Sequence, residues 1–198
     1  GHYAGLLNLG KESYNSKNIP LYSMPKLHDF ILNNGPWNQL VNLNNINLVK
    51  IFADKELILD DNLSLTPVQV PHRDEYSETV GFIIKGNLKK ALYIPDIDKW
   101  NNWNISIVEM IKKVDFAFLD GTFYDSKEIN NRDISEIPHP FIIESLDLFK
   151  TLSKAEKDKI YFIHLNHTNP VLNKNSKEYK SVISKGFNVA ETGMEFIL

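Results

Sequence analysis

The sequence predicts an α/β protein of four layers, in which two mixed β-sheets pack together and helices cover their outer faces. Two observations predict this class. Segments of strand type first follow one another as hairpins and then alternate with helical segments, a pattern typical of sheets with external helices. The chain of 198 residues, 42% of them hydrophobic, also has the size of one domain with a substantial core. We therefore expect residues 1–198 to form a single domain.

The first quarter of the chain predicts helices around one short strand. Residues 2–16 place their apolar side chains on one helical face, and residues 19–24 have the composition of a strand. A second helix is expected over residues 25–32, because proline favours the first helical position. Residues 35–40 predict a short helical turn anchored by Trp37.

The next segment predicts consecutive antiparallel strands and then a hairpin. Asp60-Asp61-Asn62 and Gly86-Asn87 are typical of the tight turns that join such strands. The expected strands are residues 48–52, 56–59, 63–70, 79–84 and 91–94.

The second half predicts helices that alternate with buried strands. Residues 122–139 are polar and irregular, and a loop of this length usually carries function. The expected helices are residues 105–114, 141–152 and 176–185, and the expected strands are residues 115–119, 159–163, 187–190 and 195–198.

Composition argues against several classes of function. The net charge of −3, with Lys and Arg spread along the chain, argues against nucleic-acid binding through bulk charge, and no apolar run is long enough to cross a bilayer. Because the sequence has no cysteine, any metal would have His, Asp or Glu ligands, which suit zinc, manganese or iron. We expect a cytoplasmic protein, although a start at Gly1 rather than Met leaves room for an upstream targeting signal. For the oligomeric state, we keep a homodimer as a hypothesis.

Four side chains suited to metal or acid–base chemistry fall at the ends of separate predicted strands. They are His72, Asp96, Asp120 and His164. Taken singly, each has an ordinary structural interpretation, as a loop histidine paired with acidic neighbours or as a turn or N-cap aspartate. Their recurrence at separate strand ends favours one shared patch of nitrogen and oxygen ligands for zinc, manganese or ferrous iron.

The order of these residues resembles the metallo-β-lactamase superfamily. In that family an H-x-H-x-D-H motif at the start of a helix precedes a lone His, an Asp and a final His. The segment from Gly1 to Leu6 is similar to the tail of the first motif, so the first strands and the first part of the motif are expected to be missing. The resemblance implies one or two divalent ions, zinc first and iron or manganese as alternatives. The implied ligands are His2, His72, Asp96 as a bridging carboxylate, and His164.

A more specific resemblance is to the PqqB-like branch of pyrroloquinoline quinone biosynthesis. It rests on Leu119-Asp-Gly-Thr-Phe-Tyr-Asp125, on Ile163-His-Leu-Asn-His-Thr-Asn-Pro170 and on the ending around Gly186 to Met194. Related tRNA 3′-end nucleases place a proton-donating histidine at the start of a helix, and His139 occupies that place. The alternative for His139 is a proline-flanked residue that only starts the helix.

The resemblance also implies roles for the remaining polar residues. His139 and Asp120 would transfer protons, whereas Arg73, Glu75 and His167 would contact the metal ligands or the substrate. Gly1 stands where the superfamily has a metal-binding Asp, and His167 stands where the quinone-biosynthesis proteins have Asn.

Three functions remain open at this point. The first is a metal-dependent hydrolase, in which a metal-activated water attacks a phosphodiester or an ester-like bond of a small-molecule or phosphodiester substrate. The second is an iron-dependent oxygenase or hydroxylase in pyrroloquinoline quinone biosynthesis, acting on a tyrosine-derived precursor. The third is a non-catalytic binding protein on the same fold.

Overall fold

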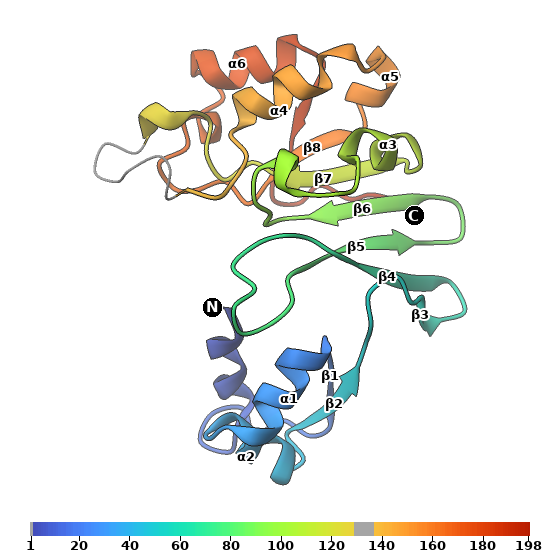
Figure 1. Cartoon of the computed structure of the whole chain (residues 1–198), viewed down its shortest axis with the longest axis vertical. Helices are drawn as coiled ribbons and strands as arrows, with labels where there is room; N and C mark the ends of the chain where they lie inside the picture. Colours follow the sequence, from blue (N-terminus) through green and yellow to red (C-terminus); the bar gives the residue numbers. More distant parts are fainter. Residues whose placement is uncertain (1, 129–136) are drawn as a thin grey trace. The chain divides into compact units, whose positions relative to one another are not determined.

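Figure 1 shows the computed structural model of the chain, which describes residues 2–128 and 137–198. The chain forms two compact units. The amino-terminal unit comprises Gly1–Lys55 and Arg73–Glu78, and the sheet unit comprises Glu56–His72 and Thr79–Leu198. That all 198 residues form one domain stays a prediction. Every helix in the described residues is too short or too polar to span a bilayer.

The amino-terminal unit packs short helices against a two-stranded sheet. Its small core contains Ile31, Leu40 and Ile46, all buried. Pro25 takes the first helical position of α1, as predicted, because its fixed φ suits the start of a helix. The elements are η1 (His2–Leu9), β1 (Ile19–Ser23), α1 (Pro25–Asn33), α2 (Trp37–Asn42) and β2 (Ile46–Lys50).

Two predictions for this unit were wrong. The helix predicted over residues 2–16 is a 3₁₀ helix that ends at Leu9, where Gly10 begins a series of turns. The strand predicted over residues 48–52 does not open the antiparallel series, because β2 pairs in parallel with β1. Alternating residues indicate which side chains are buried but not which strand is the partner. Here α1 and α2 supply the long crossover that a parallel pair requires.

The sheet unit contains one mixed sheet of seven strands in sequence order. The strands from β3 to β6 pair antiparallel, which confirms the predicted hairpins, and those from β6 to β9 pair in parallel. The α/β class is therefore confirmed, with a mixed sheet here and a parallel pair in the other unit. The strands are β3 (Leu57–Asp60), β4 (Leu63–Gln69), β5 (Val80–Lys85), β6 (Lys90–Ile94), β7 (Phe116–Asp120), β8 (Ile160–Ile163) and β9 (Asn188–Val189).

Helices and 3₁₀ turns fill the connections between the parallel strands (Figure 1). Ser106, Ser153 and Ser176 begin three of the helices by accepting a backbone N–H through their hydroxyl oxygens. The short helix α5 was not predicted. The helices are α3 (Ile107–Lys112), α4 (Ile142–Leu148), α5 (Lys154–Lys157) and α6 (Lys177–Ser184), and the 3₁₀ turns are η2 (Trp100–Asn102), η3 (Ser126–Glu128), η5 (Phe149–Thr151) and η6 (Pro170–Leu172).

The core of the sheet unit lies between the central strands and these helices. Leu92, Leu119 and Phe162 of three neighbouring strands are fully buried in one cluster with Ile111 of α3 and Phe149 of η5. Burial of a side chain of this size contributes about 1.5–3 kcal/mol. The central strands are therefore firmly anchored, and residues at their ends start from fixed positions.

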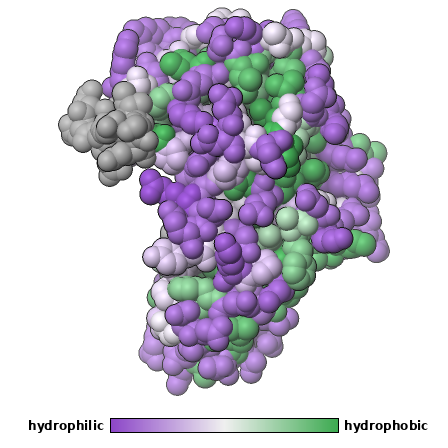
Figure 2. All heavy atoms as spheres, viewed as in Figure 1, coloured by the Kyte–Doolittle hydropathy of each residue, from purple (hydrophilic) through white to green (hydrophobic). Residues whose placement is uncertain are grey.

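An aromatic group lies on the opposite face of the sheet. Phe116, Phe118 and Tyr161 surround Phe196, with edge-to-face ring centroids 4.8–5.1 Å apart. The strand predicted over residues 195–198 was wrong, because this segment packs through Phe196 without joining the ladder. Figure 2 shows hydrophobic side chains between hydrophilic ones in its upper part, which belongs to this unit.

Strand direction brings four polar segments to the same edge of the sheet. The ends of β6, β7 and β8 are level, because Ile94 lies opposite Leu119, and Asp120 lies opposite Ile163. Because β4 and β6 are both antiparallel to β5, β4 ends at this edge as well. Ligands of α/β sheets commonly bind outside such carboxyl ends.

Candidate metal centre

His72 follows the end of β4 and lies between two aspartates that follow β6. Its Nε2 is 3.0 Å from Oδ1 of Asp96, and its Nδ1 is 3.1 Å from Oδ1 of Asp98. The Thr79 hydroxyl donates to the carbonyl of His72, and the N–H of Asp98 donates to the carbonyl of Pro71. These bonds tie the two loops together, so the imidazole is held in one orientation.

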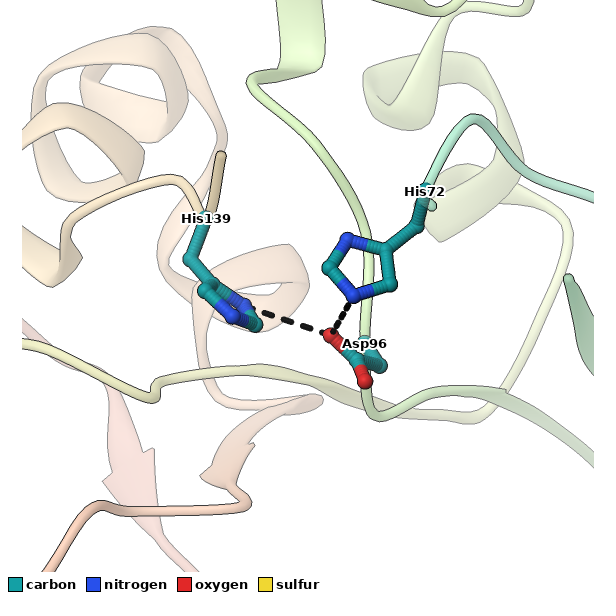
Figure 3. A group of neighbouring side chains, drawn as sticks. All are labelled: His72, Asp96 and His139. Atoms are coloured by element: carbon teal, nitrogen blue, oxygen red, sulfur yellow. Dashed lines mark ion pairs between the residues drawn. The ribbon is translucent and has the colours of Figure 1, made fainter. Parts of the chain in front are cut away.

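Oδ1 of Asp96 is the atom at which two imidazoles meet (Figure 3). It lies 3.3 Å from Nδ1 of His139, in addition to the contact with His72. The atom is buried, yet it accepts no hydrogen bond from the described residues. One ligand atom from each of His72, Asp96 and His139 lies within 4.8 Å of the others. We call these three residues the metal group.

His139 reaches this group from the loop before α4 and is held by a buried aspartate. Its Nδ1 is 2.8 Å from Oδ2 of Asp120, whose side chain is 0% exposed. The carboxylate of Asp120 also accepts the backbone N–H groups of Ile97 and Thr122 at 3.2 and 2.8 Å. Both oxygens of Asp120 thus accept hydrogen bonds, and His139 donates through Nδ1.

The aspartates around His139 change its proton affinity. Burial by itself lowers the pKa of His139, since it disfavours the charged ring. The hydrogen bond from His139 to Asp120, together with the negative charges of Asp120, Asp96 and Asp98, outweighs burial and raises the pKa above its ordinary value of 6.5. Without a metal ion, the site therefore favours positive charge at this ring.

His164 directly follows β8 and lies on the other side of His139. The two ring centroids are 6.4 Å apart, and Nδ1 of His164 is 3.0 Å from the hydroxyl of Thr122. Its backbone is in the left-handed region, with φ of 59°. The structure thus brings His164 beside the metal group, and its role as a ligand stays a prediction.

The donor set of the metal group fits a divalent ion. Metal–ligand bonds of about 2.0–2.2 Å place neighbouring ligand atoms roughly 3 Å apart. The contact of Asp96 Oδ1 with Nε2 of His72, at 3.0 Å, matches that spacing. Since Nδ1 of His72 donates to Asp98, the lone pair of the neutral ring is on Nε2 and faces a carboxylate oxygen. A cation between these two acceptors would remove their repulsion.

The other predicted site residues are only partly placed. The side chain of His2 and residues 129–136 lie outside what the structure describes. His167 is exposed in the loop after β8, and Arg73 and Glu75 are exposed in the amino-terminal unit. Their roles stay predictions. Asp120 lies where predicted, at the end of β7, although its complete burial was not foreseen.

Two residues of the site were missed by the sequence analysis. Asp98 contacts His72, and Thr122 contacts Asp120 and two histidines. Each lies two residues beyond an aspartate that was identified. The repeated spacing in Asp96-Ile97-Asp98 was the available signal for the first, whereas a threonine in a turn carries almost none.

An open cavity of about 580 Å³ lies on the sheet unit next to segments that carry the site. Its lining includes Lys99, which follows Asp98, and Pro140, which follows His139. Lys99 is already paired with Glu144 of α4, with Nζ 2.7 Å from Oε2. The cavity has the volume of a small-molecule site.

Comparison with known proteins identifies the family and several relatives. A family model described as a beta-lactamase superfamily domain matches residues 2–165. The coenzyme PQQ synthesis protein B of Gluconobacter oxydans (strain 621H) is 31% identical over 126 residues, which cover 61% of this chain and 40% of that protein. The protein of the same name from Xanthomonas axonopodis pv. citri (strain 306) is 27% identical over 219 residues, covering 100% of this chain and 69% of that protein. The chain spans less than half the length of several such relatives.

Solved structures share the fold. The crystal structure of Zn²⁺-bound PqqB from Methylobacterium extorquens superposes with a TM-score of 0.77 at 23% identity, covering 98% of this chain and 69% of that one. Unliganded yeast PDE1 gives a TM-score of 0.52 at 11% identity, covering 89% of this chain and 55% of that one.

Proposed function

Because the chain belongs to the beta-lactamase superfamily, we propose that it is a divalent-metal enzyme of the PqqB type, acting in the synthesis of coenzyme PQQ. The observation that carries the proposal is the metal group. Its buried Asp96 oxygen lies 3.0 and 3.3 Å from two imidazole nitrogens and accepts no hydrogen bond from the residues that the structure describes. Curated relatives that match the chain carry the name coenzyme PQQ synthesis protein B, which supports the pathway.

His72, Asp96 and His139 are the residues that would hold the ion, with His164 and His2 as further predicted ligands. When bound, such an ion acts as a Lewis acid and lowers the pKa of a coordinated water, or, if it is iron, supports redox chemistry. Asp98 orients His72 and Asp120 orients His139, since each carboxylate accepts from Nδ1.

The transfer of a proton is the alternative role of His139 in this proposal. Its Nδ1 hydrogen is held by the fully buried Asp120, so the ring cannot rotate without losing that bond. The hydrogen bond to Asp120 and the nearby carboxylates outweigh burial and raise the pKa of His139 above its ordinary value, which favours the protonated ring that a proton donor needs. Loss of metal from His139→Ala would assign the residue to ligation, and retention of metal with slow turnover would assign it to proton transfer.

The reaction class that we propose first is oxygen-dependent oxidation of a small-molecule precursor of PQQ with iron in the site. A site of histidine and carboxylate ligands without thiolates suits ferrous iron. The cavity lined by Lys99 and Pro140 has room for such a molecule, and its described lining adjoins the metal group in sequence without including any of its residues. Metal-dependent hydrolysis is the second candidate, because the PqqB structure from Methylobacterium extorquens contains zinc, which has no redox chemistry.

Two measurements test this function. The gene is expressed in a bacterium that lacks its own coenzyme PQQ synthesis protein B, and PQQ is quantified. We expect the wild type to restore PQQ and His72→Ala to fail, whereas wild-type protein that accumulates without restoring PQQ would refute the pathway. In the second, protein purified without oxygen is subjected to elemental analysis. Iron with oxygen-dependent turnover supports oxidation, and zinc with oxygen-independent turnover supports hydrolysis.

A further inference from the structure

One hydroxyl connects two histidines of the site, His139 from the loop before α4 and His164 from the end of β8. Oγ1 of Thr122 lies 2.6 Å from Oδ1 of Asp120, 3.0 Å from Nδ1 of His164 and 3.3 Å from Nδ1 of His139. We propose that Thr122 is a positioning residue, which fixes the ring tautomer of His164 and joins this ring to the Asp120–His139 pair. This inference rests on the proposed metal-dependent function, because it concerns the same site.

The direction of each hydrogen bond follows from the chemistry of the groups. Both oxygens of Asp120 already accept a backbone N–H, from Thr122 and from Ile97. The carboxylate therefore acts as an acceptor, and the Thr122 hydroxyl donates its single hydrogen to Asp120. Only lone pairs remain on that oxygen for His164, so Nδ1 of His164 must carry the hydrogen. In the neutral ring, the lone pair then lies on Nε2, as ligation through that nitrogen would require.

The backbone of Thr122 is fixed from the loop that carries His164. The carbonyl of Thr122 accepts from the N–H of Asn166 at 2.9 Å and from Nδ2 of Asn169 at 3.2 Å. Asn169 is 2% exposed, and its amide also donates to the carbonyl of Gly121 at 2.8 Å. The hydroxyl therefore has a defined position relative to both histidines, as a positioning role requires.

Removal of the hydroxyl has a specific consequence for His164. Thr122→Val keeps the branched shape and the backbone N–H to Asp120 but offers no acceptor to Nδ1 of His164. A neutral imidazole without such an acceptor favours the Nε2–H tautomer in water, which would move the lone pair away from Nε2. Thr122→Ser is the matched control, because it retains the hydroxyl and loses only a methyl group.

The test is ¹⁵N NMR of the imidazole rings in metal-free protein, at a pH where the histidines are neutral. We expect His164 to be Nδ1–H in the wild type and in Thr122→Ser, and to shift toward Nε2–H in Thr122→Val. Affinity for zinc should fall about 10- to 100-fold in Thr122→Val and stay unchanged in Thr122→Ser. This range is typical when a metal ligand loses its hydrogen-bond partner. Thermal unfolding of each variant verifies that it is folded.

The outcomes separate this inference from the proposed function. An Nε2–H tautomer for His164 in the wild type overturns the role of Thr122, even if Thr122→Val fails to fold. An unchanged tautomer in folded Thr122→Val overturns it as well. Wild-type protein that binds no metal refutes the proposed function, whereas the tautomer measurement needs no metal and still decides on Thr122.

Discussion

The two histidines of the metal group are held by carboxylates in very different surroundings. Asp98, which holds His72, lies in a loop and its side chain is 25% exposed. Asp120, which holds His139, ends a central strand, is 0% exposed and receives four hydrogen bonds. Buried hydrogen-bond acceptors are costly to disturb, whereas an exposed carboxylate is screened by water. We infer that a change at Asp120 costs more stability than the same change at Asp98.

Removal of a metal ligand should have the largest effect, a loss of metal affinity. This loss should not depend on which carboxylate holds the histidine. His72→Ala is expected to reduce metal affinity by more than about 100-fold, beyond the roughly 10- to 100-fold loss typical of an outer partner. The reason is that it deletes a nitrogen 3.0 Å from Asp96 Oδ1 and leaves that oxygen with one imidazole. Elemental analysis after dialysis against a defined metal buffer measures the loss.

His28→Ala is the matched control, since His28 belongs to α1 in the amino-terminal unit. It should leave metal content unchanged. Metal content of His72→Ala equal to that of the wild type would remove His72 from the site. His164→Ala, measured in parallel, tests the ligand that the sequence predicted, and we expect it to lose most of the metal.

The second-largest effect should come from Asp120→Asn, which is expected to lower the free energy of unfolding. One amide hydrogen of asparagine would point at a backbone N–H of Ile97 or Thr122, so at least one buried donor loses its acceptor. An unsatisfied buried group costs about 1–3 kcal/mol in the free energy of unfolding. Urea unfolding of metal-free protein measures this cost. A variant as stable as the wild type would show that the burial of Asp120 is not important for stability.

The matched substitution Asp98→Asn should have a smaller effect and so sharpen the comparison. Asparagine can still accept from Nδ1 of His72, and the site is partly exposed. We expect a change in the free energy of unfolding below about 1 kcal/mol, as for exposed ion pairs. Metal affinity should fall by no more than about 10-fold, at the low end of outer-partner effects. A loss of stability equal to that of Asp120→Asn would contradict the proposed difference between the two sides.

The smallest expected effect is a change in folding stability with pH. The raised pKa of His139 means that protonation stabilises the folded, metal-free protein. That contribution is complete below the unfolded pKa of about 6.5 and is lost as pH rises through the higher folded pKa. The difference in stability between wild type and Asp120→Asn should therefore shrink as pH rises above about 6.5. Urea unfolding across this range measures it, and a difference that grows with pH would reverse the assigned sign.

Sequence alone located most of the site because its residues follow strands. Hydrophobic runs identified β4, β6, β7 and β8, and the polar residue after each run gave His72, Asp96, Asp120 and His164. Parallel strands end at one edge of a sheet, so such residues converge whenever the strands are neighbours. The α/β class followed from the same runs. The partner of β2 did not, because pairing depends on the crossover between strands.

Only the tertiary structure decided how these side chains are grouped. His139 comes from a loop with no strand to predict its position, yet it lies 3.3 Å from Asp96, whereas His164 lies beyond it. The roles of Asp98 and Thr122 also depend on contacts across 26 and 42 residues of sequence. Residue types and spacing determined which donors the chain offers to a metal. The packing of loops that are distant in sequence decided which histidines contact the same carboxylate oxygen. Contacts of about 3 Å form only when separate segments of the chain meet in the folded structure.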